Sequence, residues 1–347
     1  MRTTRTAAAA VLALALTACG SAGATDTAGS TAAAAQGATD AFPVTVEHAF
    51  GETTIEQAPT RVATVSWVNA DVSIALGVVP VGMPRDDWGG NEQGSTPWKD
   101  AALEQAGAAI GTEGAPAQYA ETDGIDVNAI AALAPDVILG AYSGLTQEEY
   151  DKLSKIAPVV AYPDTPYGTA WQDSTRLIGE ALGRSEAAEE LVEQTEQTIA
   201  DEVAEHPALA GTTFIYGNLE PATGAGVNVY TASDNRPRFL TSLGMEQAEV
   251  VDVNTKDDGS FFFEWSPERA DELEADVFVT WVPEAGTVEQ IEADPLLSQI
   301  PAVQRGTLVA DSDNTLTLSI SAASPLSLPW ALERFLPKLA AAAEKAA

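Results

Sequence analysis

Two stretches in different halves of the chain share one pattern: Ala131-Ala-Leu-Ala-Pro-Asp-Val-Ile-Leu139 and Asp271-Glu-Leu-Glu-Ala-Asp-Val-Phe-Val279. Each reads as the end of a helix, an Asp-Val pair and then a buried strand. Two more pairs of stretches match: Ala75-Leu-Gly-Val78 with Ser242-Leu-Gly-Met245, and Leu153-Ser-Lys-Ile-Ala-Pro-Val159 with Leu297-Ser-Gln-Ile-Pro-Ala-Val303. The three stretches occur in the same order in both halves of the chain. Three matches in one order predict two lobes of like topology. Chance similarity among generic α/β units is the alternative.

Around these stretches, short apolar runs alternate with helical segments from Pro59 onward. Such alternation is typical of an α/β fold with mainly parallel sheets. Ahead of it, residues 44–46 and 54–55 alternate apolar and polar side chains around Gly51, which predicts a β-hairpin. The predicted strands are 62–65, 79–82, 137–141 and 159–162 in the first half, and 213–216, 250–253, 277–281 and 307–310 in the second.

Two helices are predicted between the halves. Trp171, Ile178 and Leu182 mark the first, and the second runs from a capping Ser185 to Glu205. The second is about 30 Å long, enough to join two lobes while permitting only modest movement. The expected organisation is an N-terminal α/β lobe at 42–168, linking helices at 169–206 and a C-terminal α/β lobe at 207–347. The whole binding module then covers about 61–345.

The N-terminal residues read as an export signal. Residues 1–18 have a basic start and roughly 12 apolar residues, too few for a membrane anchor but typical of a signal peptide. The next residue, Cys19, is the only cysteine, and Leu16-Thr17-Ala18-Cys19-Gly20 resembles the bacterial lipobox. Residues 19–41 are then a lipid-attached, flexible tether, which places the protein on the extracytoplasmic face of a bacterial cell membrane.

Composition excludes several partners. The 347 residues include 51 acidic and 17 basic side chains, a formal charge of −34, which argues against nucleic acid and anionic membrane surfaces. One cysteine cannot form a disulfide within a monomer, and a monomer is expected.

Aromatic and polar side chains recur where the predicted strands end, and ligands of parallel sheets bind beyond those ends. The candidate ligand-binding residues are Trp67, Arg85, Trp88, Tyr142 and Ser143 in the first half, and Asn218, Arg236 and Trp281 in the second. Large rings with few polar anchors suit a bulky, partly apolar ligand in a cleft between the lobes. Local packing is the alternative for each ring. Arg85 either neutralises an anionic ligand or forms a surface salt bridge, and Arg236 either binds ligand or caps a helix near 239–243.

Signatures of catalysis are absent from the sequence. It contains no nucleophile elbow, P-loop or dinucleotide fingerprint. Its two histidines, His48 and His206, cannot make a His-rich zinc site, so a metal ion would arrive already chelated. We therefore expect neither an enzyme nor a bound cofactor.

The chain resembles the iron-siderophore (class III) substrate-binding lipoproteins of ABC importers. The resemblance covers about residues 43–345 and rests on these stretches: Val46-Glu-His-Ala-Phe-Gly-Glu-Thr53, Pro59-Thr-Arg-Val62, Leu76-Gly-Val-Val-Pro-Val-Gly82, Ile125-Asp-Val127, Leu133-Ala-Pro-Asp-Val137 and Ala323–Leu332. It implies two lobes joined by a long helix, a ferric siderophore as ligand and an ABC permease as partner. By position, Trp67 resembles a pocket aromatic, Arg85 an arginine that reaches the chelate oxygens, and Tyr142 a nearby tyrosine.

The resemblance also implies docking to the permease through one exposed glutamate per lobe. Glu268 matches in the second lobe, or is an ordinary acid in the first turn of a helix. In the first lobe Asn128 stands at the glutamate position. Either Asp123, Asp126 or Glu121 compensates, or docking is asymmetric.

Three other functions are weighed against this one. A corrinoid or haem carrier belongs to the same class, but no His or Met stands at a predicted cleft position to ligate haem. A secreted hydrolase would need a nucleophile beside a base. An adhesion or scaffolding lipoprotein would not need a cleft lined with aromatic rings.

Overall fold

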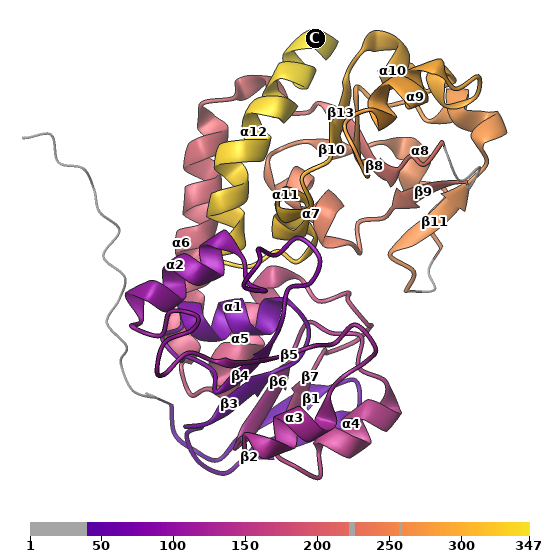
Figure 1. Cartoon of the computed structure of the whole chain (residues 1–347). Coiled ribbons are helices and arrows are strands. Elements are labelled where there is room, and N and C mark those ends of the chain that lie inside the picture. The colour runs from indigo at the N-terminus through magenta and orange to yellow at the C-terminus, as the bar shows by residue number, and fades with distance from the viewer. Residues whose placement is uncertain (1–39, 222–225, 257–258) are drawn as a thin grey trace, which may run out of the picture. The chain divides into compact units, whose positions relative to one another are not determined.

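The computed structural model describes residues 40–221, 226–256 and 259–347 (Figure 1). The predicted signal peptide, Cys19 and nearly all of the tether lie outside these residues. Within them, no helix combines the length and the apolar character needed to cross a membrane.

The first lobe is built on a fully parallel sheet of five strands, in the order β5-β4-β3-β6-β7. The predicted hairpin precedes it as β1 (Val44–His48) and β2 (Gly51–Ile55), paired antiparallel. The strands of the sheet are β3 (Val62–Thr64), β4 (Gly82–Pro84), β5 (Ala117–Tyr119), β6 (Val137–Gly140) and β7 (Val159–Ala161). All of β3, β4, β6 and β7 is buried, as expected for a parallel sheet covered on both faces.

The second lobe has a mixed sheet of six strands, in the order β11-β9-β8-β12-β13, with β10 pairing to β8. The strands are β8 (Thr213–Asn218), β9 (Val227–Tyr230), β10 (Glu246–Gln247), β11 (Phe262–Trp265), β12 (Val277–Trp281) and β13 (Leu308–Asp311). The pairs among β8, β10, β12 and β13 are parallel, whereas β9 is antiparallel to both β8 and β11. The α/β fold with two similar, mainly parallel sheets is therefore confirmed.

Helices pack around both sheets. In the first half they are α1 (Val68–Ala75), α2 (Pro97–Gln105), α3 (Val127–Ala132), α4 (Gln147–Leu153), α5 (Trp171–Ala181) and α6 (Ser185–Ala204). In the second half they are α7 (Asn235–Ser242), α8 (Glu249–Asp252), α9 (Thr287–Ala293), α10 (Pro301–Arg305), α11 (Asn314–Ser321) and α12 (Ser327–Ala346). The 3₁₀ segments are η1 (Pro207–Leu209), η2 (Pro267–Glu272, kinked at Arg269) and η3 (Leu297–Gln299).

The repeated Asp-Val pair has the same structural role in both lobes. In the first, Thr60 donates to Asp136 Oδ2 from its backbone N–H and its hydroxyl, each at 2.8 Å. In the second, Thr213 donates to Asp276 Oδ2 in the same two ways, at 2.9 and 2.7 Å. Each aspartate precedes one strand and fastens the start of its neighbour. The repeated Asp-Val pair in the sequence thus corresponds to equivalent hydrogen bonds in the two lobes.

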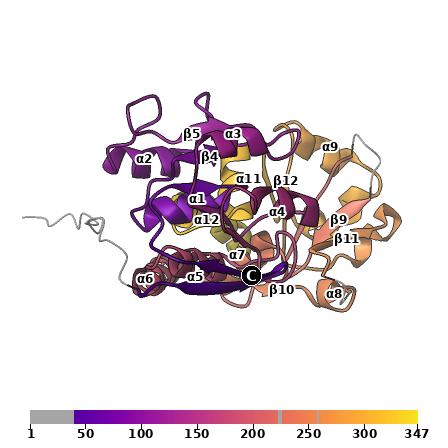
Figure 2. The same ribbon diagram turned by 90° about the horizontal axis from the view of Figure 1, so that it is seen from below.

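The two central helices, α5 and α6, lie side by side (Figure 2). The capping prediction for Ser185 is wrong, because Arg184 occupies the N-cap position and Ser185 is the first helical residue. Asp40 takes the capping role from outside the helix: its Oδ2 accepts from the Ser185 N–H at 3.0 Å and from the hydroxyl at 2.6 Å. The C-terminal helix α12 packs along α6 (Figure 1).

Two strand predictions differ from the structure. Residues 250–253 were predicted as a strand but lie at helix α8 and its C-cap, where Val251 is buried and Val253 is 70% exposed. A central strand would bury both faces, and a segment of four residues, three valines and Asp252, is too short to distinguish the two structures. The predicted strand 79–82 instead begins at Gly82, because Pro80 has no N–H to donate to a sheet.

The C-terminal segment returns to the first lobe. Leu318 and Ala322 belong to the same apolar cluster as Val68 and Trp98. Deeper in the contact, the Ser324 hydroxyl donates to Asp71 Oδ2 at 2.8 Å, with both residues buried. The lobes are thus joined by shared core as well as by the linking helices.

Candidate functional site

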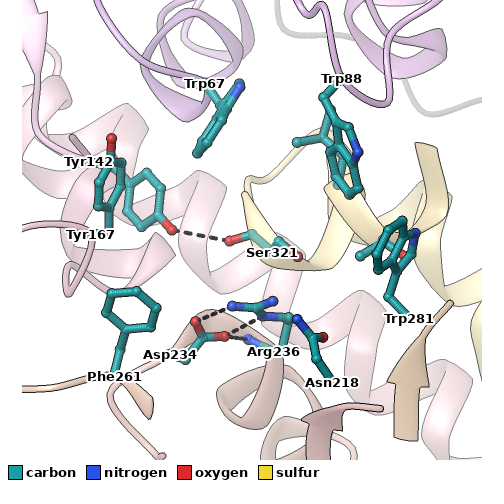
Figure 3. A pocket seen from close by; sticks show the side chains of 12 residues that line it. Trp67, Trp88, Tyr142, Tyr167, Asn218, Asp234, Arg236, Phe261, Trp281 and Ser321 are labelled. Carbon is teal, nitrogen blue, oxygen red and sulfur yellow. Dashed lines mark hydrogen bonds and ion pairs between the residues drawn. The ribbon is translucent and has the colours of Figure 1, made fainter. Parts of the chain in front are cut away.

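A cavity of about 450 Å³ lies between the strand ends of the two sheets (Figure 3). Its wall combines aromatic rings from the first lobe with mostly polar side chains from the second. The lining residues are Trp67, Trp88, Tyr142, Tyr167, Asn218, Asp234, Arg236, Phe261, Trp281, Thr317, Leu318 and Ser321. The two sheets thus share one pocket.

Sheet topology explains why these residues meet. The strand order of the first sheet reverses between β3 and β6, and parallel sheets open a crevice at such a switch point. Trp67 follows β3 and Tyr142 follows β6. In the second sheet the order reverses between β8 and β12, which end at Asn218 and Trp281. Four predicted ligand residues therefore stand at the two switch points.

Three rings of the pocket are exposed. Trp67 is 39% exposed, Trp88 40% and Tyr167 37%, among the most exposed large apolar side chains of the described chain. Because all three rings line the same pocket, they expose apolar surface at one place, as ligand-binding sites do. The ring centroids of Trp67 and Tyr167 are 6.1 Å apart, and those of Tyr167 and the buried Tyr142 are 5.8 Å apart.

Contacts also cross the pocket between the lobes. The ring centroids of Trp88 and Trp281 are 6.1 Å apart in an edge-to-face arrangement. Beside Trp88, Gly89 has a positive φ of 75°, and a Cβ there would lie 2.7 Å from the carbonyl oxygen of Asn314 on α11. Glycine at this position lets the first-lobe loop approach the second lobe.

Tyr142 is held at both ends. Its backbone N–H donates to Asn69 Oδ1 at 3.1 Å, and the Asn69 amide donates to the carbonyls of Tyr142 and Val65, the residues just beyond β6 and β3. Its hydroxyl donates to the Ser321 carbonyl at 3.2 Å, across to α11. Burial raises the pKa of Tyr142, so the hydroxyl stays protonated and remains a donor at physiological pH.

The first-lobe wall includes backbone in an uncommon conformation. Ser66 and Tyr167 have φ of 62° and 56°, in the left-handed region that side chains other than glycine rarely adopt. The Ser66 N–H donates to Glu121 Oε2 at 2.9 Å. Burial raises the pKa of Glu121 to about 7. A half-buried carboxylate thus helps to position the residue that precedes Trp67.

The second lobe supplies the charged groups of the pocket. Arg236 donates from Nε and Nη2 to the two carboxylate oxygens of Asp234, each at 2.7 Å, and from its backbone N–H at 2.8 Å. Its guanidinium carbon lies 3.5 Å from the ring centroid of Tyr230, so it is stacked as well as paired. Burial alone would lower the pKa of Arg236, but the paired carboxylate raises it, which keeps the cation charged.

Six of the eight predicted ligand residues line this pocket: Trp67, Trp88, Tyr142, Asn218, Arg236 and Trp281. Ser143 does not, because it is buried and its hydroxyl donates to the Gly140 carbonyl at 2.7 Å. Arg85 also lies outside the lining. It forms the salt bridge weighed as the alternative, with Nε 3.5 Å from Asp87 Oδ1, and it packs over Gly94, where a Cβ would lie 2.5 Å from its guanidinium carbon.

The sequence did not reveal the other lining residues: Tyr167, Asp234, Phe261, Thr317, Leu318 and Ser321. Tyr167 lies six residues beyond the end of β7, in a loop that no periodicity marks. Thr317, Leu318 and Ser321 lie on α11. This helix begins three residues after the end of β13, and a helix that follows a parallel strand directly is a signal for pocket residues that the sequence contains. Asp234 precedes Arg236 by two residues and caps α7. An aspartate two residues before an arginine is a local signal that the two side chains form an ion pair.

All of the residues considered for docking except the half-buried Glu121 are exposed. Glu268 is exposed in the first turn of η2, and Asn128 is exposed on α3. Of the three acids near Asn128, Asp126 caps α3 by accepting from the Ala129 N–H at 2.9 Å, Glu121 accepts from Ser66, and Asp123 is exposed. In the described part of the chain, no three His, Cys, Asp or Glu side chains are grouped so as to hold a metal ion.

Comparison with solved structures gives the same fold. PiaA of Streptococcus pneumoniae TIGR4, solved in complex with ferrichrome, is 35% identical with a TM-score of 0.80, over 87% of this chain and 99% of that one.

Curated relatives cover most of the chain at lower identity. The Fe(3+) dicitrate-binding periplasmic protein FecB of Escherichia coli K12 is 26% identical, over 79% of this chain and 84% of its own length. The ferric enterobactin-binding periplasmic protein FepB of Escherichia coli O6:H1 is 25% identical, over 80% and 86%. The family model described as periplasmic binding protein matches residues 62–315, which include both sheets and nine of the twelve residues that line the pocket. The chain therefore belongs to the periplasmic binding protein family.

Proposed function

We propose that this protein captures a ferric siderophore outside the cytoplasm and delivers it to an ABC permease. The observation that carries the proposal is the shared pocket, in which exposed rings from one lobe face polar groups from the other. A relative of similar fold, at 35% identity, was solved with ferrichrome. Two curated relatives are named for ferric citrate and ferric enterobactin. Ferric chelates are thus the ligand class common to these relatives.

The pocket residues divide the work of binding. Trp67, Trp88 and Trp281 contact the apolar surface of the chelate, and Tyr142, Asn218 and Arg236 contact its oxygen atoms. Iron enters already chelated, so the protein supplies no ligand to the metal and no cofactor. The role is non-covalent capture and not catalysis, since the pocket holds rings and hydrogen-bonding groups and no nucleophile beside a base.

Delivery requires an anchor and a docking surface. In this proposal Cys19 carries the lipid that holds the monomer at the membrane, and Glu268 contacts the permease. The exposure of Glu268 in the second lobe supports this role. In the first lobe, the exposed Asp123 is the acid near Asn128 that has no capping or positioning bond described above.

The binding proposal is tested by titrating the purified full chain with ferric chelates while tryptophan emission is recorded. Trp67 and Trp88 face the pocket, so a bound ferric chelate should quench their emission. Repeating the titration with the gallium(III) chelates in a calorimeter controls for light absorbed by iron. Absence of binding by hydroxamate, catecholate and citrate chelates in both experiments would remove the iron assignment.

Delivery is tested separately with Glu268→Ala. Because Glu268 lies outside the pocket lining, the affinity for ligand should stay unchanged, whereas uptake of ferric chelate by cells should fall several-fold. Glu264→Ala, another exposed acid of the second lobe, serves as the control for loss of a surface charge. Loss of affinity in Glu268→Ala, or normal uptake, would contradict the docking role.

A further inference from the structure

The charge of the pocket lining is balanced. Of the twelve lining residues, all in the described part of the chain, only Asp234 and Arg236 carry charge. They form a bidentate pair with both N–O distances at 2.7 Å. The pocket walls thus contain one cation and one anion in direct contact, and their formal charges cancel.

The pair is fixed in place and not a chance rotamer. The Asp234 carboxylate caps α7, and the Arg236 guanidinium is stacked on Tyr230. The Arg236 side chain is 15% exposed and that of Asp234 10%, so water screens the pair little. An incoming anion would have to compete with a carboxylate that already occupies the bidentate face of the guanidinium.

Two other arginines of the chain, Arg238 and Arg85, are also engaged by protein groups. Arg238 donates to the carbonyls of Ala232 and Gly168, at 3.0 and 2.8 Å, and burial lowers its pKa. Arg85 is paired with Asp87. The whole chain carries a formal charge of −34. An anionic ligand therefore meets no uncompensated cation in the lining and a repulsive field around it.

The unpaired polar groups of the pocket are neutral. Within the described residues, Asn218 Oδ1 and Ser321 Oγ are buried without a hydrogen-bond partner, and both residues line the pocket. A buried polar atom without a partner is costly unless a ligand satisfies it. Neutral amide and hydroxyl groups beside aromatic rings suit a ligand whose surface is apolar and amide-rich and carries no net charge.

We propose that Asp234, by neutralising Arg236, makes this pocket selective for ferric chelates without net charge, of the trihydroxamate class. Three hydroxamate groups carry one negative charge each and balance Fe³⁺, whereas three catecholates leave a charge of −3 and ferric citrate complexes are anionic. Nη1 of Arg236 is not engaged by Asp234 and still donates to a chelate oxygen. The inference rests on the proposed function and narrows it to one ligand class.

The test compares the dissociation constants of ferrichrome, ferric citrate and ferric enterobactin for the full chain and for Asp234→Asn. Asparagine keeps the shape of aspartate and can still cap α7 through Oδ1, but it removes the negative charge and one of the two acceptors for Arg236. The wild type should bind ferrichrome at least about tenfold more tightly than either anionic chelate. In Asp234→Asn the positive charge of Arg236 is no longer neutralised. The preference for ferrichrome over the anionic chelates should therefore fall by about tenfold or more, as expected for a new charge-assisted hydrogen bond to the anion.

Asp201→Asn removes an acidic charge from α6, outside the pocket lining, and should leave the ratio unchanged. If the wild type binds the anionic chelates as tightly as ferrichrome, or if Asp234→Asn leaves the ratio within about threefold, the selectivity inference is overturned and the transport proposal stands. If no chelate binds, the transport proposal itself fails. The two failures are thus distinguishable.

A second measurement needs no mutation. A ferric trihydroxamate that carries one carboxamide and the same compound with a carboxylate in its place differ in charge and hardly in size. The wild type should bind the charged compound about tenfold more weakly. Equal affinity would overturn the role of Asp234 even if Asp234→Asn does not fold.

Discussion

The two lobes share a plan but contribute differently to the pocket. Both place two residues at a switch point of a mainly parallel sheet, and both fasten neighbouring strands with an Asp–Thr bond. The first lobe then supplies four aromatic rings, whereas the second supplies the ion pair and most of the polar groups. The duplicated sheets therefore determine the position of the pocket, and the segments that follow the strands determine which side chains each lobe contributes to its lining.

Both lobes bury charged groups, but the pair of the second lobe lines the pocket, whereas the cluster of the first lobe lies outside its lining. Behind Trp67 the first lobe buries an ionic cluster in which Lys99 Nζ lies 2.7 Å from Asp86 and 3.5 Å from Asp71. Asp71 also accepts from the Trp98 indole at 2.6 Å and from Ser324 of the returning segment. All three charged residues are at most 3% exposed. Loss of the lysine would leave two buried carboxylates facing each other.

The largest expected effect is that of Lys99→Met. Removing one partner of a buried ionic network costs about 3–5 kcal/mol, so the free energy of unfolding should fall by that amount in a denaturant titration. Lys152→Met breaks an exposed pair with Glu148 and should change stability far less. Similar losses in the two variants would show that the first lobe does not depend on this cluster.

The next effect concerns the wall behind Trp67 and depends on pH. The pKa of Glu121 is raised by burial from 4.5 to about 7, so the folded protein holds this proton more tightly than the unfolded chain. Its contribution to the free energy of unfolding is full below pH 4.5, falls as pH rises to about 7 and then levels off. Glu121→Gln should remove this dependence and stabilise the protein at pH 8 by up to about 3 kcal/mol, with little change at pH 4. A parallel shift at both pH values would contradict the assignment.

A third comparison sets one ring of each lobe against the other. Trp67→Ala should weaken ligand binding by about 1.5–3 kcal/mol, because its exposed ring is free to cover the chelate. Trp281 is anchored by a hydrogen bond from its indole N–H to Asn314 Oδ1 at 2.8 Å. Trp281→Phe, which keeps a ring, should lose less. Dissociation constants from calorimetry measure both, and a larger loss at Trp281 would move the centre of the site into the second lobe.

The smallest effect is expected at Arg85. Its guanidinium is engaged by Asp87, Gln93 and Gln118 and lies outside the pocket lining. Arg85→Ala should therefore change ligand affinity by less than about threefold, a difference below about 0.7 kcal/mol. A tenfold loss would place Arg85 in the ligand-bound site and extend the pocket toward the loop at 86–94.

The sequence predicted the parts of this fold that follow from periodicity and repetition. The Asp-Val pairs at 136 and 276 predicted two lobes, and residues directly after strands, such as Trp67 and Tyr142, were found by a rule about strand ends. The rule failed at Arg85, where the loop beyond β4 turns the side chain toward Gly94. It could not reach Tyr167, whose place depends on how a long loop folds back. The sequence places Asp234 two residues before Arg236, but it does not predict that Nε and Nη2 of Arg236 donate to this carboxylate.

The left-handed backbone at Ser66 has a consequence for engineering. Glycine tolerates this conformation, so Ser66→Gly would relieve about 1 kcal/mol of strain in the folded chain, but the greater freedom of glycine in the unfolded chain offsets about the same amount. The same change would free Trp67 to swing, because the turn that aims its ring would no longer be restricted. Selection for heat tolerance alone would therefore gain little from glycine at this position, whereas ligand binding would lose the rigid turn that positions the Trp67 ring.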